Sequence, residues 1–149
     1  MTQFTFRLET LRKLRESERQ QRRQELAEAY LAEERIQQQI ATMEGEQEET
    51  RKRSTVAASP GSVSVDRLLD THRYQILLQS RFQHLEGQRD RIREELDCRR
   101  QALVEADREV RVLEKLREKQ QAVHRAEEEK REMKERDEIA QRHVRPAES

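Results

Sequence analysis

The sequence predicts an all-α protein in which two long helices fold into an antiparallel coiled-coil hairpin, with the second helix longer and overhanging the first. Two observations predict this class. Only 32% of the 149 residues are hydrophobic and 42% are charged, with three glycines and two prolines, a composition typical of long helices rather than of a compact domain. The apolar residues also recur at alternating steps of three and four, which is the spacing of a coiled-coil seam.

The turn of the hairpin is predicted in the only cluster of helix-breaking residues, Ser54 to Asp66, where Pro60 and Gly61 are adjacent. Proline and glycine interrupt helices, and the surrounding serines favour a loop. The first helix is therefore expected at about residues 4–53, the turn at 54–66, the second helix at about residues 65–143 and a frayed tail at 144–149. In this prediction residues 1–149 form a single elongated domain.

The second helix carries the stronger seam. Nine of its eleven seam positions are apolar: Leu78, Phe82, Leu85, Ile92, Leu96, Leu103, Ala106, Val110 and Leu113. Arg89 and Arg99 interrupt the pattern. Such regular spacing predicts a folded helix and not a disordered tract, in spite of the polar composition.

The first helix has a weaker seam. Its expected positions are Leu26, Ala29, Glu33, Ile36, Ile40 and Met43, with Phe4, Leu8, Leu11 and Leu14 marking its start. Every residue between Leu14 and Leu26 is polar, and four arginines in or just before this stretch share one face of the helix: Arg12, Arg15, Arg19 and Arg22. A fold-back at Pro60 makes the numbers of paired residues sum to about 120, which brings this stripe near Asp97, Glu105 and Asp107. Surface ion pairs contribute only about 0 to 1 kcal/mol each, so these arginines are expected to add little to stability. The stripe instead either fixes the register of the hairpin or contacts an acidic partner.

The second helix is expected to extend beyond the first. At 1.5 Å per residue, about fifty residues span roughly 75 Å and about eighty span roughly 120 Å, so the overhang begins at about Leu116. It is nearly all charged, and a helix that is polar on every side either bridges solvent or lies inside another protein. Phe4, Phe6 and Leu8 are expected opposite residues 112–116, where they form a hydrophobic clasp, insert into a ring, or do both.

Several classes of function are disfavoured. The 31 Lys and Arg balance the 31 Asp and Glu and are mixed along the chain, which argues against nucleic-acid binding. No long apolar run is present, so direct membrane insertion is not expected. The glycines are isolated, the four histidines and Cys98 have no ligand spacing, and a two-helix rod offers no concave pocket. We therefore expect no catalytic residue, no cofactor and no metal, and the lone cysteine fits a cytoplasmic location.

Both ends of the chain resemble the family of the flagellar export protein FliJ. The opening "FTFRLETLRKLRESE" carries the Phe, Leu-Glu, Leu, Leu-Arg pattern of that family, and "MKERDEIAQRH" is similar to its C-terminal segment. The central "VDRLLDTHRY", the length and the two-helix layout also match. The resemblance covers nearly the whole chain.

This resemblance implies a soluble component of the flagellar type III export apparatus, cytoplasmic and peripherally associated with the inner membrane through that apparatus. It implies a stalk and adaptor that links the hexameric flagellar export ATPase to the export gate protein FlhA and binds export chaperones. The helix ends are implied to enter the ATPase ring, with the contact residues Phe4, Phe6, Leu8, Leu11, Asp137, Ile139 and Arg142. The free chain is expected to be monomeric; the alternative is a generic structural or scaffolding coiled coil that self-associates.

An excess of apolar residues in "DRLLDTHRYQILLQSRF", residues 66–82, predicts a second contact site. Each residue advances a helix by about 100°, so Leu68, Leu78 and Phe82 follow the seam whereas Leu69 and Ile76 fall nearly opposite. Either the turn segment 56–65 or a partner covers those two. The resemblance places the gate-contacting surface on Tyr74, Leu78 and Arg81. The predicted docking site for the gate comprises Leu69, Tyr74, Ile76, Leu77, Leu78 and Arg81.

Overall fold

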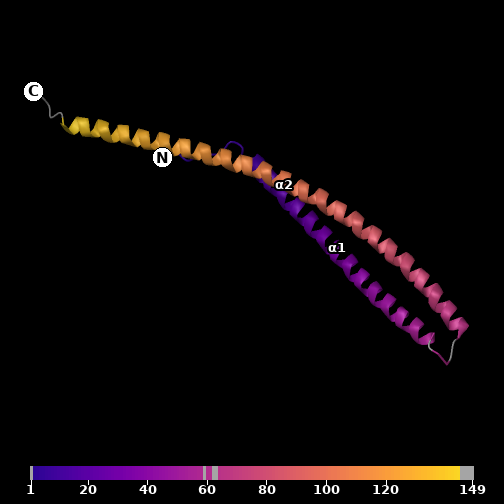
Figure 1. The fold of residues 1–149 in the computed structure, drawn as a ribbon. Helices are drawn as coiled ribbons and strands as arrows, with labels where there is room; N and C mark the ends of the chain where they lie inside the picture. Colours follow the sequence, from indigo (N-terminus) through magenta and orange to yellow (C-terminus); the bar gives the residue numbers. More distant parts are fainter. Residues whose placement is uncertain (1, 59, 62–63, 145–149) are drawn as a thin grey trace, which may run out of the picture. The chain divides into compact units, whose positions relative to one another are not determined.

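The computed structural model of the chain describes residues 2–58, 60–61 and 64–144. Two α-helices, α1 (Glu9–Ala57) and α2 (Val65–Val144), account for most of this part, and no strand occurs within it. Figure 1 shows the two helices joined by the turn and lying side by side next to it. The predicted all-α hairpin with a longer second helix is confirmed. The predicted fraying at 145–149 lies outside the described residues.

The helix ends differ from the prediction mainly in α1, which begins at Glu9 rather than at residue 4. Four of the five residues at positions 2–6 are threonine or phenylalanine. These are weaker helix formers than the leucines and arginines that follow. A turn at residues 7–8 leads into α1, and it is closed by the amide of Glu9, which donates to the carbonyl of Phe6 at 3.1 Å. At its other end α1 continues to Ala57, four residues beyond the predicted Arg53.

The turn is set by glycine and by a helix cap. Gly61 has a φ of 125°, a conformation that side-chain-bearing residues rarely adopt. Ser64 precedes α2, and its hydroxyl accepts the amide of Arg67 at 3.5 Å, as an N-cap serine does. Together they account for the start of α2 at Val65, where the sequence predicts it.

Contacts divide the chain into two compact units, each of which contains part of both helices. Unit 1 comprises residues 1–20 and 104–149, and unit 2 comprises residues 21–103 with the turn. The division falls within the stretch between Leu14 and Leu26, where α1 has no apolar residue. Because each unit contains part of both helices, the single elongated domain stays a prediction.

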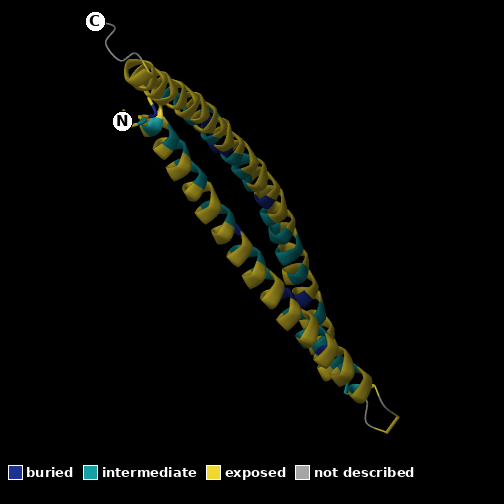
Figure 2. Cartoon of the chain, turned by 90° about the vertical axis from the view of Figure 1, so that its left-hand side faces the viewer, coloured by how far each residue is buried: buried dark blue, intermediate teal, exposed yellow. Residues whose placement is uncertain are grey.

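The seam of unit 2 lies where the sequence predicts it. Leu78, Leu96, Ile40 and Ala29 are buried, and the remaining predicted seam positions of this unit are all half-buried. In Figure 2 the buried and half-buried residues of unit 2 line the facing sides of the helices, whereas the outer sides are exposed. The core is therefore one narrow row of side chains from each helix.

The two arginines that interrupt the α2 seam are accommodated differently. Arg99 donates to the backbone carbonyl of Glu25 on α1 and to the carboxylate of Glu95 at 2.9 Å. The Nε of Arg89 is buried and has no hydrogen-bond partner among the described residues, but it lies 3.6 Å from the carboxylate of Asp90 on its own helix. Arg99 thus adds a cross-helix bond at its level, whereas Arg89 is paired only within α2.

Polar contacts establish an antiparallel register. In unit 2, Arg93 pairs with Glu33 at 3.4 Å and Arg100 donates to the Tyr30 hydroxyl at 2.9 Å. In unit 1, Arg19 pairs with Asp107 at 3.1 Å. The numbers of paired residues sum to between 126 and 130 at these contacts, and they sum to 124 for Arg15 with Glu109 and for Arg99 with Glu25. The register therefore lies a few residues beyond the predicted sum of about 120.

Candidate interaction surfaces

The core of unit 1 is built from α2 aliphatics and α1 arginines. Ala106, Val110 and Leu113 of α2 are buried, Val110 completely. Opposite them α1 presents its arginine stripe, and the side chains of Arg12 and Arg19 retain only 16% and 17% exposure. Arginine can cover apolar surface with its methylene stem while its guanidinium reaches a carboxylate, and these stems supply the cover that α1 lacks.

The charged groups of this stripe are paired within unit 1 for three of the four arginines. Arg19 reaches Asp107, as the sequence predicts, and Arg15 reaches Glu109 at 3.4 Å. Arg12 pairs with Glu9 at 2.6 Å on its own helix, and this bidentate contact lowers the pKa of the Glu9 carboxyl. The arrangement favours the register role of the stripe over contact with an acidic partner.

The leucines expected to start the α1 seam lie elsewhere. Leu8 and Leu11 are exposed, and Leu14 is 54% exposed. That part of the predicted seam is wrong, because the arginines occupy the face toward α2 and turn the leucines to its flank. Phe6 is the apolar residue that the N-terminal region buries.

Residues 2–8, which precede α1, form a segment that we call the N-terminal strap. The amide and the hydroxyl of Thr2 both donate to Glu128 Oε1, at 3.1 and 2.8 Å. The Phe4 ring packs edge-on against His124, with ring centroids 5.6 Å apart, and Phe6 is buried. These contacts match the hydrophobic clasp among the alternatives predicted for Phe4 and Phe6.

The strap reaches further along α2 than the sequence predicts. Thr2 and Phe4 are two residues apart, whereas Glu128 and His124 are four apart. A non-helical chain advances about 3.3 Å per residue and a helix about 1.5 Å, so two strap residues match one turn of α2. The expected position opposite residues 112–116 is wrong because it treats residues 4–8 as helix.

The unpartnered part of α2 is correspondingly shorter than predicted. Side chains at positions 121, 124 and 128 are half-buried, whereas every residue from Glu129 to Val144 is exposed. We call residues 129–144 the free helical end, and it begins at Glu129 instead of Leu116. It contains three predicted ring-contact residues, Asp137, Ile139 and Arg142, all on its surface.

The Thr2 contact makes the strap sensitive to pH. The hydrogen bond from Thr2 lowers the pKa of the Glu128 carboxyl, because it stabilises the ionised form. A lowered pKa in the folded state means that this contact contributes above the ordinary value of 4.5 and is lost as pH falls below it. We expect the nuclear Overhauser contact between Phe4 and His124 to persist at neutral pH and to weaken in acid.

The variant Glu128→Gln should remove this titration from the strap, leaving the Phe4 contact weaker at neutral pH and no longer responsive to protonation of residue 128 in acid. Glu129→Gln removes the same charge from a neighbouring, exposed position and is the matched control. An equal loss of the acid response in the control would contradict the assignment to Glu128.

The second surface lies in unit 2, on α2 near the turn. We call Leu69, Tyr74, Ile76, Leu77 and Arg81 the turn-proximal surface. All five are exposed, Ile76 by 59%. The described turn residues leave Leu69 and Ile76 open to solvent. Leu78, which the sequence assigns both to the seam and to the gate contact, is 0% exposed and in this fold belongs to the seam.

The Thr2 contact with Glu128 and the non-helical form of residues 2–6 were not predicted, although Thr2, Thr5 and the two phenylalanines were a signal against helix there. Within the described residues no group of His, Cys, Asp and Glu is placed to hold a metal ion. Neither α1 nor α2, over its described length, contains a segment apolar enough to cross a membrane.

The fold and these surfaces define a helical-hairpin protein that presents contact surfaces on long, largely polar helices. A comparison with protein families finds a match to the family described as "Flagellar FliJ protein" over residues 4–149. The chain belongs to the FliJ family, and its function is related to flagellar protein export. Comparisons with curated proteins and with solved structures find no match.

Proposed function

We propose that the protein is a stalk and adaptor that links the hexameric flagellar export ATPase to the export gate protein FlhA and also binds export chaperones. The observation that carries this proposal is the free helical end of α2, residues 129–144. It continues α2 for about 24 Å beyond the last strap contact. A single helix that is largely polar and has no partner within the hairpin is suited to enter a channel formed by another protein.

The ring contact is assigned to the helix ends in unit 1. A lone α-helix is about 10–12 Å wide, so the free helical end fits a narrower opening than a helix pair. Asp137, Ile139 and Arg142 offer two charges of opposite sign around one exposed aliphatic side chain. Leu8 and Leu11, which are also exposed in unit 1, complete the proposed contact, whereas Phe4 and Phe6 hold the strap.

The gate contact is assigned to the turn-proximal surface in unit 2. Leu69 and Ile76 are seven residues apart and therefore project from one side of α2, about 20° from alignment. Exposed apolar residues that share a side of a helix are typical of a groove-binding helix. Their exposure, in a chain with few hydrophobic residues, supports the binding of a partner protein at this position. If that partner is the export gate, the protein acts in the cytoplasm at the inner membrane.

Ile76→Asp is expected to weaken binding to the cytoplasmic region of the gate at least about tenfold, since a charge would be buried at the contact. Helicity and melting should change little, because exposed substitutions usually alter stability by less than about 0.5 kcal/mol. Binding is measured by calorimetry and helicity by circular dichroism.

Val112→Asp is the matched control, because Val112 is 61% exposed on the same helix but lies in unit 1. It should bind the gate as the natural chain does. A large loss of helicity in Ile76→Asp alone would show that Ile76 is a core residue and would contradict the docking assignment.

The proposal as a whole is tested by adding the purified chain to the flagellar ATPase and measuring hexamer formation and turnover. Stimulation of both is expected. Absence of stimulation, together with sedimentation of the chain as a stable parallel dimer, would instead support the self-associating scaffold.

A further inference from the structure

The end of unit 2 next to the turn contains a pocket of about 570 Å³ between the two helices. The last turns of α1 contribute Arg53 and Ala57 to it, and the first turns of α2 contribute Ser64, Arg67 and Thr71. It lies on the seam side of α2, whereas Leu69 and Ile76 lie on the far side. The pocket is therefore separate from the surface assigned to the gate.

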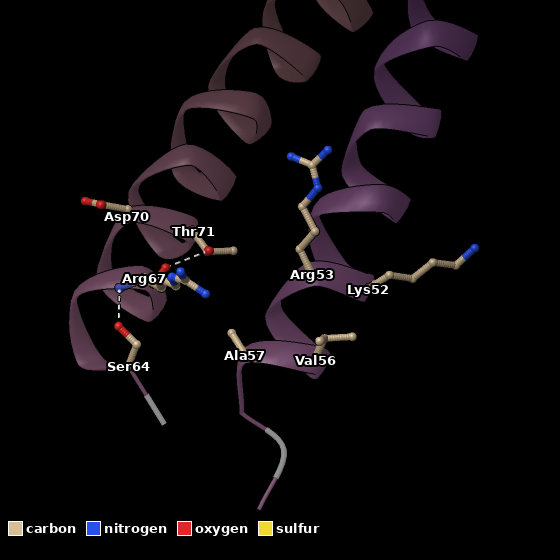
Figure 3. Close-up of a pocket in the computed structure, with 8 residues that line it drawn as sticks. All are labelled: Lys52, Arg53, Val56, Ala57, Ser64, Arg67, Asp70 and Thr71. Carbon is tan, nitrogen blue, oxygen red and sulfur yellow. Dashed lines mark hydrogen bonds between the residues drawn. The ribbon is translucent and has the colours of Figure 1, made fainter. Parts of the chain in front are cut away.

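Two guanidinium groups face this pocket from different helices. Figure 3 shows Arg53 and Arg67 extending into the space between α1 and α2, while Lys52 and Asp70 point away from it. Neither guanidinium has an ion-pair partner within residues 2–58, 60–61 and 64–144. Arg67 is held in place through its backbone, since its amide donates to Ser64 and its carbonyl accepts the Thr71 hydroxyl at 2.7 Å.

The turn region also carries a local excess of positive charge. Residues 51–73 contain five Lys and Arg but two Asp, whereas the chain as a whole has a net charge of zero. Arg51 is paired with Glu48 at 3.0 Å. Glu46 and Glu49 also precede this stretch, but Arg53 and Arg67 form no ion pair within residues 2–58, 60–61 and 64–144.

An oxyanion in this pocket would accept charge-assisted hydrogen bonds from the guanidinium groups of Arg53 and Arg67. It would also offset the repulsion between these two positive charges. The guanidinium fork matches the geometry of a carboxylate or a phosphate, and the N-terminal end of α2 adds a favourable dipole. The Ala57 methyl group points toward α2 in Figure 3 and gives the pocket an apolar wall. A wall of this kind suits the methylene groups of an acidic side chain better than a bare inorganic ion.

We propose that this pocket is a docking site for an acidic segment of a partner protein, whose carboxylates contact Arg53 and Arg67. The site goes beyond the proposed ring and gate contacts. It uses other residues, so either proposal can fail without the other.

The test is titration of the full chain with hexaglutamate capped at both ends, and with hexaglutamine as the uncharged reference. We expect saturable binding of hexaglutamate that weakens as ionic strength rises from about 0.01 M to about 0.15 M, because the Debye length falls from about 30 to about 8 Å. Arg53→Gln with Arg67→Gln should weaken binding about tenfold. Glutamine is nearly as good a helix former as arginine, so helicity should be retained.

Arg23→Gln with Arg91→Gln is the matched control, because it removes one exposed arginine from each helix of the same unit. It should bind hexaglutamate as the natural chain does, and an equal loss in this pair would overturn the proposal. If the Arg53 and Arg67 glutamine variant loses helicity, Arg53→Lys with Arg67→Lys keeps the charge without the fork. This variant should bind with intermediate affinity, and unchanged affinity would overturn the two-fork geometry.

Inorganic phosphate and phosphatidylglycerol vesicles distinguish the other sources of an oxyanion. Neither should bind the pocket as tightly as hexaglutamate. Binding of phosphate or of vesicles that is lost in the Arg53 and Arg67 variant, without binding of hexaglutamate, would overturn the assignment to an acidic protein segment.

Discussion

Replacing Leu78 with alanine is expected to lower the free energy of unfolding of the hairpin by about 2–5 kcal/mol. Leu78 is wholly buried and lies in a seam that is only one row of side chains wide. A cavity at this level has no second layer of core that could relax into it. The loss is measured by denaturant titration followed by circular dichroism.

Leu77→Ala is the matched control for this substitution. It removes the same atoms from the adjacent position, where the side chain is 46% exposed, and should cost less than about 1 kcal/mol. Equal losses for the two variants would show that residue 78 is not the seam position. They would also invalidate the separation of the seam from the turn-proximal surface.

A chain that ends at Glu128 is expected to keep its fold but to lose stimulation of the export ATPase. The free helical end is exposed at every position from Glu129 to Val144. Arg131, Glu132 and Glu135 share a surface pocket with Thr2 of the strap, so removal of this end should take away little buried packing. The thermal midpoint should shift by only about 1–2 °C, which corresponds to a few tenths of a kcal/mol. If residues 129–144 provide the ring contact, affinity for the ATPase should fall at least about tenfold.

Substitutions in the full chain separate side-chain contacts from helix length. Ile139→Asp should weaken the ATPase contact, because Ile139 is the exposed aliphatic residue of the predicted ring set. Glu135→Gln, one turn earlier and also exposed, is its control and should have little effect. Full stimulation by the shortened chain would contradict the assignment of the free helical end to the ring.

The seam was predictable from local information. Leu78, Leu96 and Ile40 are buried where the alternating spacing of apolar residues puts them, because a helix that packs on one partner buries one side. The assignment failed between Leu8 and Leu14, where leucines and arginines compete for the side that faces α2. Hydrophobicity alone favours the leucines on the side that faces α2. Arginine side chains can cover Val110 equally well with their methylene groups, because carboxylates within reach pair with their guanidinium groups.

The interaction surfaces were predictable to a lesser degree. The exposure of Leu69 and Ile76 follows from their angle to the seam, and the polar character of residues 129–144 follows from composition. The Thr2 contact with Glu128 joins the two ends of the chain. Arg53 and Arg67 come from different helices and line one pocket. No periodic pattern encodes such contacts, because they depend on where the register and the turn bring the two helices together.

The amino-acid sequence by itself determined the two helices, the turn at Pro60 and Gly61, the seam and the resemblance to FliJ proteins, because each depends on residues close together in the chain. Only the tertiary structure decided that residues 2–8 form a non-helical strap, that the arginines face Val110 and that the free end of α2 begins at Glu129. These features depend on the register between α1 and α2. A shift of a few residues in this register decides which part of α2 the strap reaches.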